Sequence, residues 1–284
     1  MKNWEQHFQT PVKLKLYIIH TGYVHMSGNI HFNRKSPRFK VMPKDNRFNP
    51  VLAFLVEHPK KGFILLDTGL HPSFAEKSSG NFGWLLGKIV KVKSASGQDV
   101  VKQLEKIKVN PKKVNSIILS HLHLDHTSGL PLFSENANVT VYADQDEISS
   151  AQSPASLFQG YVKDHRRKLD LKNIQYRQGI PPFDHVCDFL GDGSVFVIKT
   201  PGHTTGNISI LLNMAEGPIF LTFDASHRRA NIQEFIPPKG DYETALRSIR
   251  SIKAFIDAFP KTRMIFGHDP DQFKDLKLIP EYYS

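Results

Sequence analysis

Three histidines and an aspartate lie within six positions, from His121 to His126, directly after an apolar run. If the chain stays partly extended there, alternate residues point the same way, and a turn at 125–126 brings His126 to that side. Neutral imidazole and ionised carboxylate bind zinc at neutral pH with little deprotonation cost. The spacing therefore offers His121 and His123 to one cation, and Asp125 with His126 to a second.

Two catalytic sites need more ligands than these four, and three further candidates follow downstream. They are His203 in TPGHTTG, Asp224 in LTFDAS and His268 in IFGHD, each beside a small residue or glycine that permits a tight turn. An aspartate shared by two cations would hold them about 3.5–4 Å apart, as in two-metal hydrolases. An isolated histidine is more often structural, so it is the cluster of four that gives the others weight.

Short runs rich in β-branched and aromatic residues predict strands. These runs cover residues 14–20, 51–58, 62–69, 115–121, 138–144, 194–200, 207–213 and 218–224. Several of them, and the later MIFGH run, end in a polar residue that could bind a metal: Asp67, His121, Asp224 and His268. Side chains at strand ends meet at one rim, where rigid elements hold a site.

Apolar residues spaced three and four apart predict a helix over 241–259, which Asp241 can cap and Pro260 follows. Weaker helical patterns cover 98–108 and 145–160. Residues 22–50 and 71–97 show no clear pattern, which in a compact domain is typical of functional or mobile loops.

Composition excludes several classes. The chain has 284 residues and a single cysteine, Cys187, so it has no internal disulfide and no thiolate-rich zinc site. The first residues lack the apolar core of a secretory signal and no run has the length of a membrane helix, so we expect a cytoplasmic protein without a membrane partner. The net charge is +10, but the basic residues are dispersed, so we expect no nucleic-acid partner.

Five motifs occur in an order that resembles the metallo-β-lactamase superfamily: LLDTG (65–69), HLHLDH (121–126), TPGHTTG (200–206), FDAS (223–226) and FGHD (266–269). The resemblance covers nearly the whole chain. It implies an α+β fold, an αββα sandwich of two mixed β-sheets flanked by helices, and we expect residues 1–284 to form a single domain of this kind.

The resemblance also implies a ligand set for two divalent metal ions, with Zn²⁺ favoured. The first ion would be held by His121, His123 and His203, the second by Asp125, His126 and His268, with Asp224 bridging them. Asp67 matches an aspartate that orients a metal-bound histidine. Nitrogen and oxygen ligands also accept iron, manganese and cobalt.

Within the superfamily, LYIIHTG (16–22), SHLHLDHTSGL (120–130) and the tail from residue 265 to 283 resemble the N-acyl-homoserine lactone lactonases, which quench quorum signals. The resemblance implies that a hydroxide bridging the two metals attacks the lactone carbonyl of a small acyl lactone. Asp125 is the predicted proton shuttle to the leaving ring oxygen.

One position departs from these lactonases. Where they usually carry a tyrosine, three residues after the bridging aspartate, this chain has His227. We predict that His227 is catalytic, donating a hydrogen bond to the developing oxyanion. It could instead be a spare ligand, or an exposed loop histidine beside Arg228 and Arg229.

Other functions stay open. The same metal chemistry would serve a thioesterase like glyoxalase II or a broad lactonase or esterase. A phosphodiesterase or nuclease would need basic residues at the rim, where only Arg228 and Arg229 are obvious. A binding module on a decayed hydrolase scaffold should lack ligands, whereas all seven positions are filled. A homodimer is neither predicted nor excluded.

Acyl-chain recognition could use an apolar groove or lid from Phe82, Trp84, Leu85, Leu86 and Ile89, or Tyr23, His25 and Met26 of the early loop. These side chains could equally be ordinary core or a dimer contact. The segment 146–190, with Phe158, Tyr161 and Phe183, could cap the site.

Overall fold

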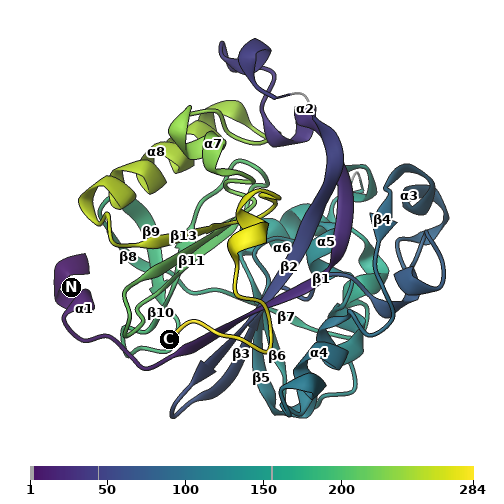
Figure 1. Ribbon diagram of the computed structural model, residues 1–284, viewed down its shortest axis with the longest axis horizontal. Coiled ribbons are helices and arrows are strands. Elements are labelled where there is room, and N and C mark those ends of the chain that lie inside the picture. The colour runs from purple at the N-terminus through teal and green to yellow at the C-terminus, as the bar shows by residue number, and fades with distance from the viewer. Residues whose placement is uncertain (1–2, 44, 155) are drawn as a thin grey trace.

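The computed structural model describes residues 3–43, 45–154 and 156–284 and contains two facing β-sheets with helices on their outer sides (Figure 1). The first sheet has the strand order β4 (Val92–Lys93), β1 (Lys15–Ser27), β2 (Asn46–His58), β3 (Gly62–Leu66), β5 (Val114–Ile118), β6 (Thr140–Ala143) and β7 (Leu171–Asn173). The second has the order β13 (Arg263–Phe266), β12 (Ile219–Phe223), β11 (Ile208–Leu212), β10 (Val195–Lys199), β9 (Phe183–Asp188) and β8 (Arg177–Ile180).

Both sheets are mixed. In the first, β1 to β3 pair antiparallel, whereas β3, β5, β6 and β7 run parallel to one another. In the second, only the β12–β13 pair is parallel among the pairs of described strands. The parallel pairs β3–β5 and β12–β13 matter most, because the carboxyl ends of parallel neighbours lie side by side.

The helices lie in the connections between strands, apart from α1 before β1 and the 3₁₀ segment η7 after β13. The α-helices are α1 (Trp4–Phe8), α2 (Gly28–His31), α3 (Gly83–Ile89), α4 (Val100–Lys106), α5 (Leu124–Thr127), α6 (Gln145–Gln152), α7 (Arg229–Gln233) and α8 (Tyr242–Ala258). Short 3₁₀ segments are η1 (Phe39–Val41), η2 (Pro72–Ala75), η3 (Pro111–Lys113), η4 (Leu130–Phe133), η5 (Ser156–Gln159), η6 (Lys163–Arg166) and η7 (Gln272–Asp275). None of the described helices is long and apolar enough to cross a lipid bilayer.

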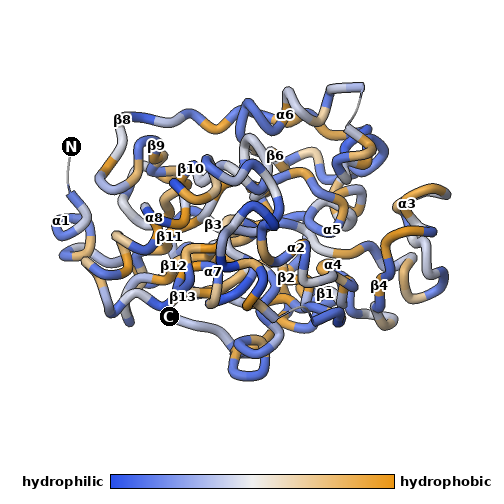
Figure 2. Tube along the Cα trace, turned by 90° about the horizontal axis from the view of Figure 1, so that it is seen from above, coloured by the Kyte–Doolittle hydropathy of each residue, from blue (hydrophilic) through white to orange (hydrophobic). Residues whose placement is uncertain are grey.

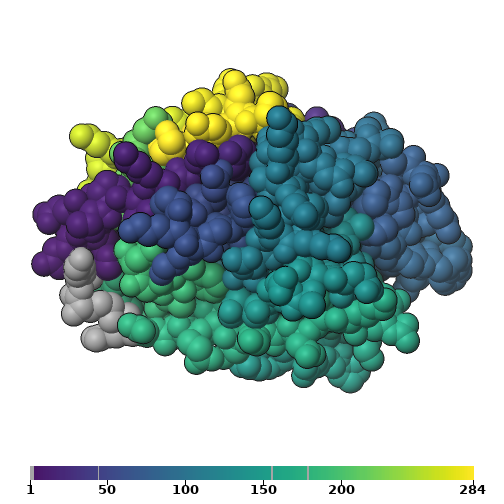
Figure 3. Space-filling view, turned by 90° about the horizontal axis from the view of Figure 1, so that it is seen from below, coloured from purple at the N-terminus to yellow at the C-terminus, as the bar shows by residue number. Residues whose placement is uncertain are grey.

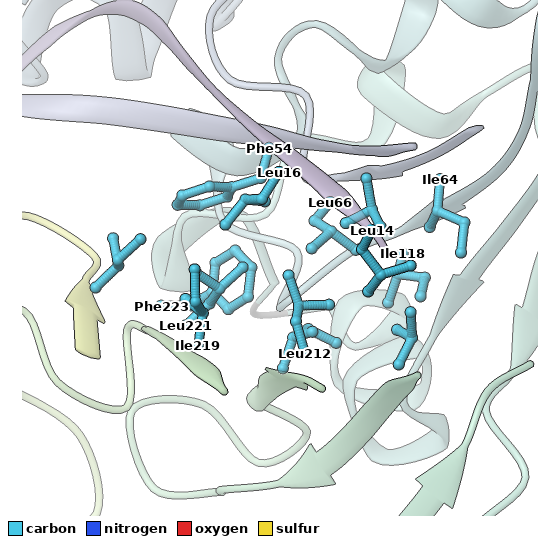
Figure 4. Packing of buried hydrophobic residues seen from close by; sticks show 14 of the residues in the cluster. Leu14, Leu16, Phe54, Ile64, Leu66, Ile118, Leu212, Ile219, Leu221 and Phe223 are labelled. Carbon is cyan, nitrogen blue, oxygen red and sulfur yellow. The ribbon is translucent and has the colours of Figure 1, made fainter. Parts of the chain in front are cut away.

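The core follows from strand alternation. Along β1, Leu16 and Ile18 face the second sheet, while Tyr17 and Ile19 face the helices on the other side. Figure 4 shows the inner layer, in which Leu16 and Phe54 lie across from the side chains of β11 and β12. In Figure 2, orange stretches of the tube run through the region of β11, β12 and β13.

Helices cover the two outer faces. The apolar stripe of α8 packs Ile249, Ile252 and Phe255 on the second sheet, and α4 packs Val100 and Leu104 on the first. The C-terminal segment lies along β1, with bridges that pair residue 283 with 16 and residue 278 with 18. In Figure 3 it appears in yellow against the purple N-terminal part.

The predicted α+β sandwich is confirmed, and each of the eight predicted strands exists, although β1 and β2 are longer than expected. The helix predicted over 145–160 ends at Gln152, because Ser153 precedes a proline and adopts an extended conformation. The sequence pattern missed β4, β7, β8 and β9, which lie at or near sheet edges and are rich in polar residues. The two unpatterned stretches contain α2, α3 and β4, so they are more structured than predicted.

Replacing Phe255 by alanine tests the packing of α8. Its ring is fully buried and lies 5.4 Å from that of Trp4 and 5.7 Å from that of Phe220, measured between centroids. We expect the free energy of unfolding, measured in denaturant, to fall by about 3–5 kcal/mol. Arg250→Ala, on the exposed face of α8, should change it by less than about 0.5 kcal/mol. Similar losses for the two variants would contradict this packing.

Candidate metal centre

Asp67 and several of the candidate ligands lie just after the ends of neighbouring strands. Asp67 directly follows β3, and His121 lies three residues after β5, the parallel neighbour of β3. Asp224 directly follows β12, and His268 lies two residues after β13, the parallel neighbour of β12. His203 lies in the turn between β10 and β11. Each sheet therefore delivers part of the cluster to the same edge of the sandwich.

Two strand ends have unusual backbone geometry. Asp67 has φ of 55° and Phe223 has φ of 45°, in the left-handed region that non-glycine residues rarely adopt. Such a conformation costs about 1–3 kcal/mol and persists where the surroundings enforce it. At Asp67 the backbone N–H donates to the carbonyl of Ile118 at 2.9 Å. With this backbone, the carboxylates of Asp67 and of Asp224, the residue after Phe223, both face His126.

Asp67 fixes the orientation of His126. Its fully buried carboxylate accepts hydrogen bonds at 2.7 Å from the backbone N–H of Ser120, the hydroxyl of Ser120 and Nδ1 of His126. Because a carboxylate only accepts, the proton of His126 lies on Nδ1 and the lone pair lies on Nε2. Nδ1 of His121 lies 3.1 Å from the same hydroxyl, which leaves Nε2 of His121 free as well.

Backbone carbonyls orient two more histidines. His203 donates from Nδ1 to the carbonyl of Lys239 at 3.0 Å, and His268 donates from Nδ1 to the carbonyl of Pro50 at 2.8 Å. Both therefore present the lone pair of Nε2. Nε2 of His203 lies only 3.0 Å from Nδ1 of His123, so two imidazoles converge on one point.

Asp224 lies between two groups of ligand atoms. Its Oδ2 is 3.3 Å from Nε2 of His203 and 3.8 Å from Nε2 of His121. Its Oδ1 is 3.4 Å from Nε2 of His126 and 3.3 Å from Nε2 of His268. Each oxygen of this single carboxylate thus faces a different set of nitrogens, which is the arrangement a bridging ligand requires.

The ligand atoms form sets that could each hold a cation. Within each set they lie within 4.8 Å of one another, and the two principal sets are His121, His123, His203 and Asp125, His126, His268. Five of these buried atoms have no hydrogen-bond partner: Nε2 of His121, His126 and His268, Oδ2 of Asp125 and Oδ1 of Asp224. Unpartnered buried lone pairs are costly, and cation binding would satisfy them. The residues present therefore fit a pair of divalent cations.

The charges in the cluster also favour binding of divalent cations. Burial lowers the pKa of His121 and of His203 well below the usual histidine range, so both offer neutral imidazoles at pH 7. Burial also lowers the pKa of His126, but the carboxylates of Asp224 and Asp125 outweigh it and raise that pKa well above its usual value. The negative potential that would hold a proton there also attracts a metal cation.

His227 is part of this cluster and is not the exposed loop residue of the alternative interpretation. Its side chain is fully buried, and its Nε2 lies 3.0 Å from Oδ2 of Asp224. Its Nδ1 lies 3.2 Å from Nδ1 of His31, another fully buried histidine. If Nε2–H donates to the carboxylate, Nδ1 accepts from His31. Arg228 is also buried, and its guanidinium is committed to Asp45 and Asn49.

Sequence reasoning did not single out Ser120, His31 or Glu147. Ser120 precedes the first histidine, and its position beside a metal motif was the available signal. His31 and Glu147 reach the site through tertiary packing from α2 and α6, and nothing in their local sequence marks them.

A cavity of about 1350 Å³ opens onto the cluster. His123, Asp125, His203, Asp224 and His227 contribute to its floor. One wall is apolar and is built by β1, α2, α3 and η5, with side chains that include Met26, Ile30, Leu85, Leu86, Ile89, Leu157 and Phe158. Polar side chains such as Ser149, Lys199, Thr204 and Thr244 also line the cavity. Such a cavity suits a molecule with a polar head and an apolar tail.

Comparison with known proteins shows which family carries this arrangement of residues. The chain matches the family described as the metallo-beta-lactamase superfamily over residues 46–268. The chain belongs to this superfamily. It is 30% identical over 261 residues to an N-acyl homoserine lactonase of a Bacillus species, which covers 90% of this chain and 96% of the relative. It is also 30% identical to the N-acyl homoserine lactonase AttM of Agrobacterium fabrum, over 83% of this chain and 88% of AttM.

A solved structure is similar to this chain over nearly its whole length. An N-acyl homoserine lactone hydrolase, solved with the product N-hexanoyl-L-homoserine at its catalytic metal centre, aligns with a TM-score of 0.77 and 27% identity. The alignment covers 96% of this chain and all of that chain. The predicted resemblance is thereby confirmed, and with it a hydrolase fold with residue clusters capable of binding metal.

Replacing Asp67 by asparagine tests how His126 is oriented. The amide keeps one acceptor and introduces a donor that faces the donors of Ser120. We expect zinc affinity at the Asp125–His126–His268 set to fall about 10–100-fold, measured by competition with a chelating dye. Asp257→Asn, an exposed aspartate of α8 paired with Lys253, is the matched control and should bind zinc like the parent protein. Unchanged affinity in Asp67→Asn would contradict the assigned orientation.

Proposed function

We propose that this chain is a metal-dependent hydrolase that opens the lactone ring of N-acyl-homoserine lactones and so quenches quorum signals. The observation that carries the proposal is Asp224, whose two oxygens face two separate sets of histidine lone pairs. The lactonase relatives, which align over most of this chain, support the choice of substrate.

Two divalent cations, with zinc favoured, would be held by the ligands assigned above. His121, His123 and His203 would hold the first, Asp125, His126 and His268 the second, and Asp224 both. When bound, such a pair supplies Lewis acidity and lowers the pKa of a coordinated water from 15.7 toward about 7.

Asp125 is the proposed proton carrier. Its Oδ2 is buried, has no hydrogen-bond partner and lies 3.6 Å from Nε2 of His268. In the reaction, the oxygen of water joins the carbonyl carbon and the ring C–O bond breaks. Asp125 accepts a proton from that water and returns it to the ring oxygen, which becomes the hydroxyl of the homoserine product.

We propose that His227 supports catalysis from the same floor. It lines the cavity and holds Oδ2 of Asp224. A single Nε2–H cannot donate fully to the carboxylate and to a substrate oxyanion at once. For His227 to stabilise the oxyanion, its Nε2–H must leave Asp224 and donate to the substrate oxygen once substrate and metal are bound.

The apolar wall would hold the acyl chain. Leu85 and Ile89 of α3 lie on this wall together with Phe158 of η5. These three are more than one third exposed, and apolar contact with an acyl chain would remove their surface from water. By contrast, Phe82 is buried in a core cluster and Trp84 is not part of the wall, so neither would contact the substrate.

We also propose that residues 1–284 form a single domain, because both sheets share one inner core and both supply ligands. A phosphodiester substrate is less suitable. Of the two arginines considered for clamping phosphate, Arg228 is buried in contacts with Asp45 and Asn49.

Metal removal tests the proposed reaction. Purified protein should hold about two equivalents of metal by elemental analysis and open homoserine lactones at neutral pH. After chelation, turnover should fall at least about 100-fold and return when zinc is added back. A thioester and bis-nitrophenyl phosphate serve as comparison substrates. Preference for either of these over every lactone, or full turnover without metal, would reject the proposed function.

His227 variants test its contribution. His227→Ala removes the hydrogen bond to Asp224, so we expect kcat to fall about 10–100-fold. His227→Gln can place an amide N–H near the position of Nε2 and should recover part of that loss. His185→Ala, at an exposed histidine on β9, is the control and should behave like the parent protein. Full activity in His227→Ala would remove His227 from the mechanism.

A further inference from the structure

Glu147 is a fully buried carboxylate outside every recognised motif. It lies in the first turn of α6, whose N-terminal cap is Asp144. Among the residues that the structure describes, none places a lysine or arginine nitrogen within ion-pair distance of Glu147. Burying a carboxylate without a cationic partner is unfavourable unless hydrogen bonds and nearby positive charge compensate. The neighbours of Glu147 should therefore show what offsets the cost of burying its charge.

Its two oxygens bind two different ligand-bearing loops. Oε1 accepts from the backbone N–H of Leu122 at 2.9 Å, and Oε2 accepts from the backbone N–H of Gly206 at 3.1 Å. Leu122 lies between His121 and His123, and Gly206 lies three residues after His203. A single side chain thus ties together the loops that carry all three histidines of the first ligand set.

The contact is close enough to demand glycine at 206. A Cβ on Gly206 would lie 2.4 Å from the backbone nitrogen of Glu147 and 2.5 Å from its Cβ, which real structures do not show. Beside it, the backbone N–H of Ile208 donates to the carbonyl of Ser120 at 2.9 Å. The two loops are therefore held in fixed register by one backbone hydrogen bond and one buried carboxylate.

Tyr161 connects the same carboxylate to His123. Burial raises the pKa of Tyr161, and the charge of Glu147 and a hydrogen bond to it raise it further. The ring of Tyr161 lies 5.4 Å from that of His123, centroid to centroid. Burial lowers the pKa of His123, and the charge of Glu147 is the largest opposing influence. Glu147 therefore influences His123 in three ways: through the backbone of the neighbouring Leu122, through the ring of Tyr161, and through its own negative charge.

We propose that Glu147 is a positioning residue that sets the spacing of His121, His123 and His203 for the first cation. This role rests on the proposed function, because it assumes that this set binds a metal. Glu147 does not line the cavity, so it would act through the ligands and not through the substrate.

Glu147→Gln tests the proposal with cobalt(II) as the metal probe, because its visible absorption reports the coordination of each ion. Glutamine has nearly the same shape, but its amide can accept from only one of the two N–H groups. We expect affinity for the first cobalt ion to fall about 10–100-fold and its absorption bands to change. Affinity for the ion at Asp125, His126 and His268 should stay within about threefold. For lactone turnover, kcat should fall, whereas KM should stay within about threefold.

Glu135→Gln is the matched control, because Glu135 is an exposed glutamate paired with the surface residue Lys168. It should match the parent protein in every measurement. Unchanged cobalt affinity in Glu147→Gln, or an equal loss at both ligand sets, would overturn the positioning role. A parent protein that binds no pair of cobalt ions, or opens no lactone, would count against the proposed function instead.

Discussion

The structure depends on the crowding of lone pairs and negative charge around Asp224. One carboxylate has Nε2 of His203 and of His268 at 3.3 Å on its two sides, and Nε2 of His126 at 3.4 Å. Hydrogen bonds from the Nδ1 atoms of these histidines to Asp67 and to the backbone carbonyls of Lys239 and Pro50 turn the Nε2 atoms inward. Such a set of acceptors repels itself unless cations lie between them. The surrounding protein holds the ligands in place against that repulsion.

The fold provides this restraint because the site and the sandwich are assembled together. The first sheet supplies residues 121–126 from the end of β5, and the second supplies His203, Asp224 and His268. Separating the two sheets would therefore divide each ligand set and remove Asp224 from the histidines that follow β5. Left-handed backbone at Asp67 and Phe223 can be tolerated because buried strands and hydrogen bonds on both sides enforce it. Metal binding and packing of the inner core should stabilise one another.

Sequence alone predicted the long strands and the seven candidate ligands, because alternation and motif spacing are local properties. It missed β4 and β7 to β9, which lie at or near the sheet edges and are rich in polar residues, so they carry no apolar run. It also missed His31 and Glu147, because a histidine that contacts a residue 196 positions away, or a glutamate that binds two loops, looks ordinary in its own segment. For the same reason the sequence did not decide whether His227 is buried or exposed, because its burial depends on the fold.

The cavity shows why the sequence predicts the reaction more readily than the substrate. Its polar floor comes from strand ends that carry the shared motifs. Its apolar wall comes from β1, α2, α3 and η5, largely within stretches that showed no periodic pattern. The floor must satisfy strict distances between charged atoms, which allows few residue types. The wall needs only apolar volume, which many sequences can supply. Relatives can therefore keep the same reaction while their acyl-chain walls diverge, and the wall is where differences in substrate preference should arise.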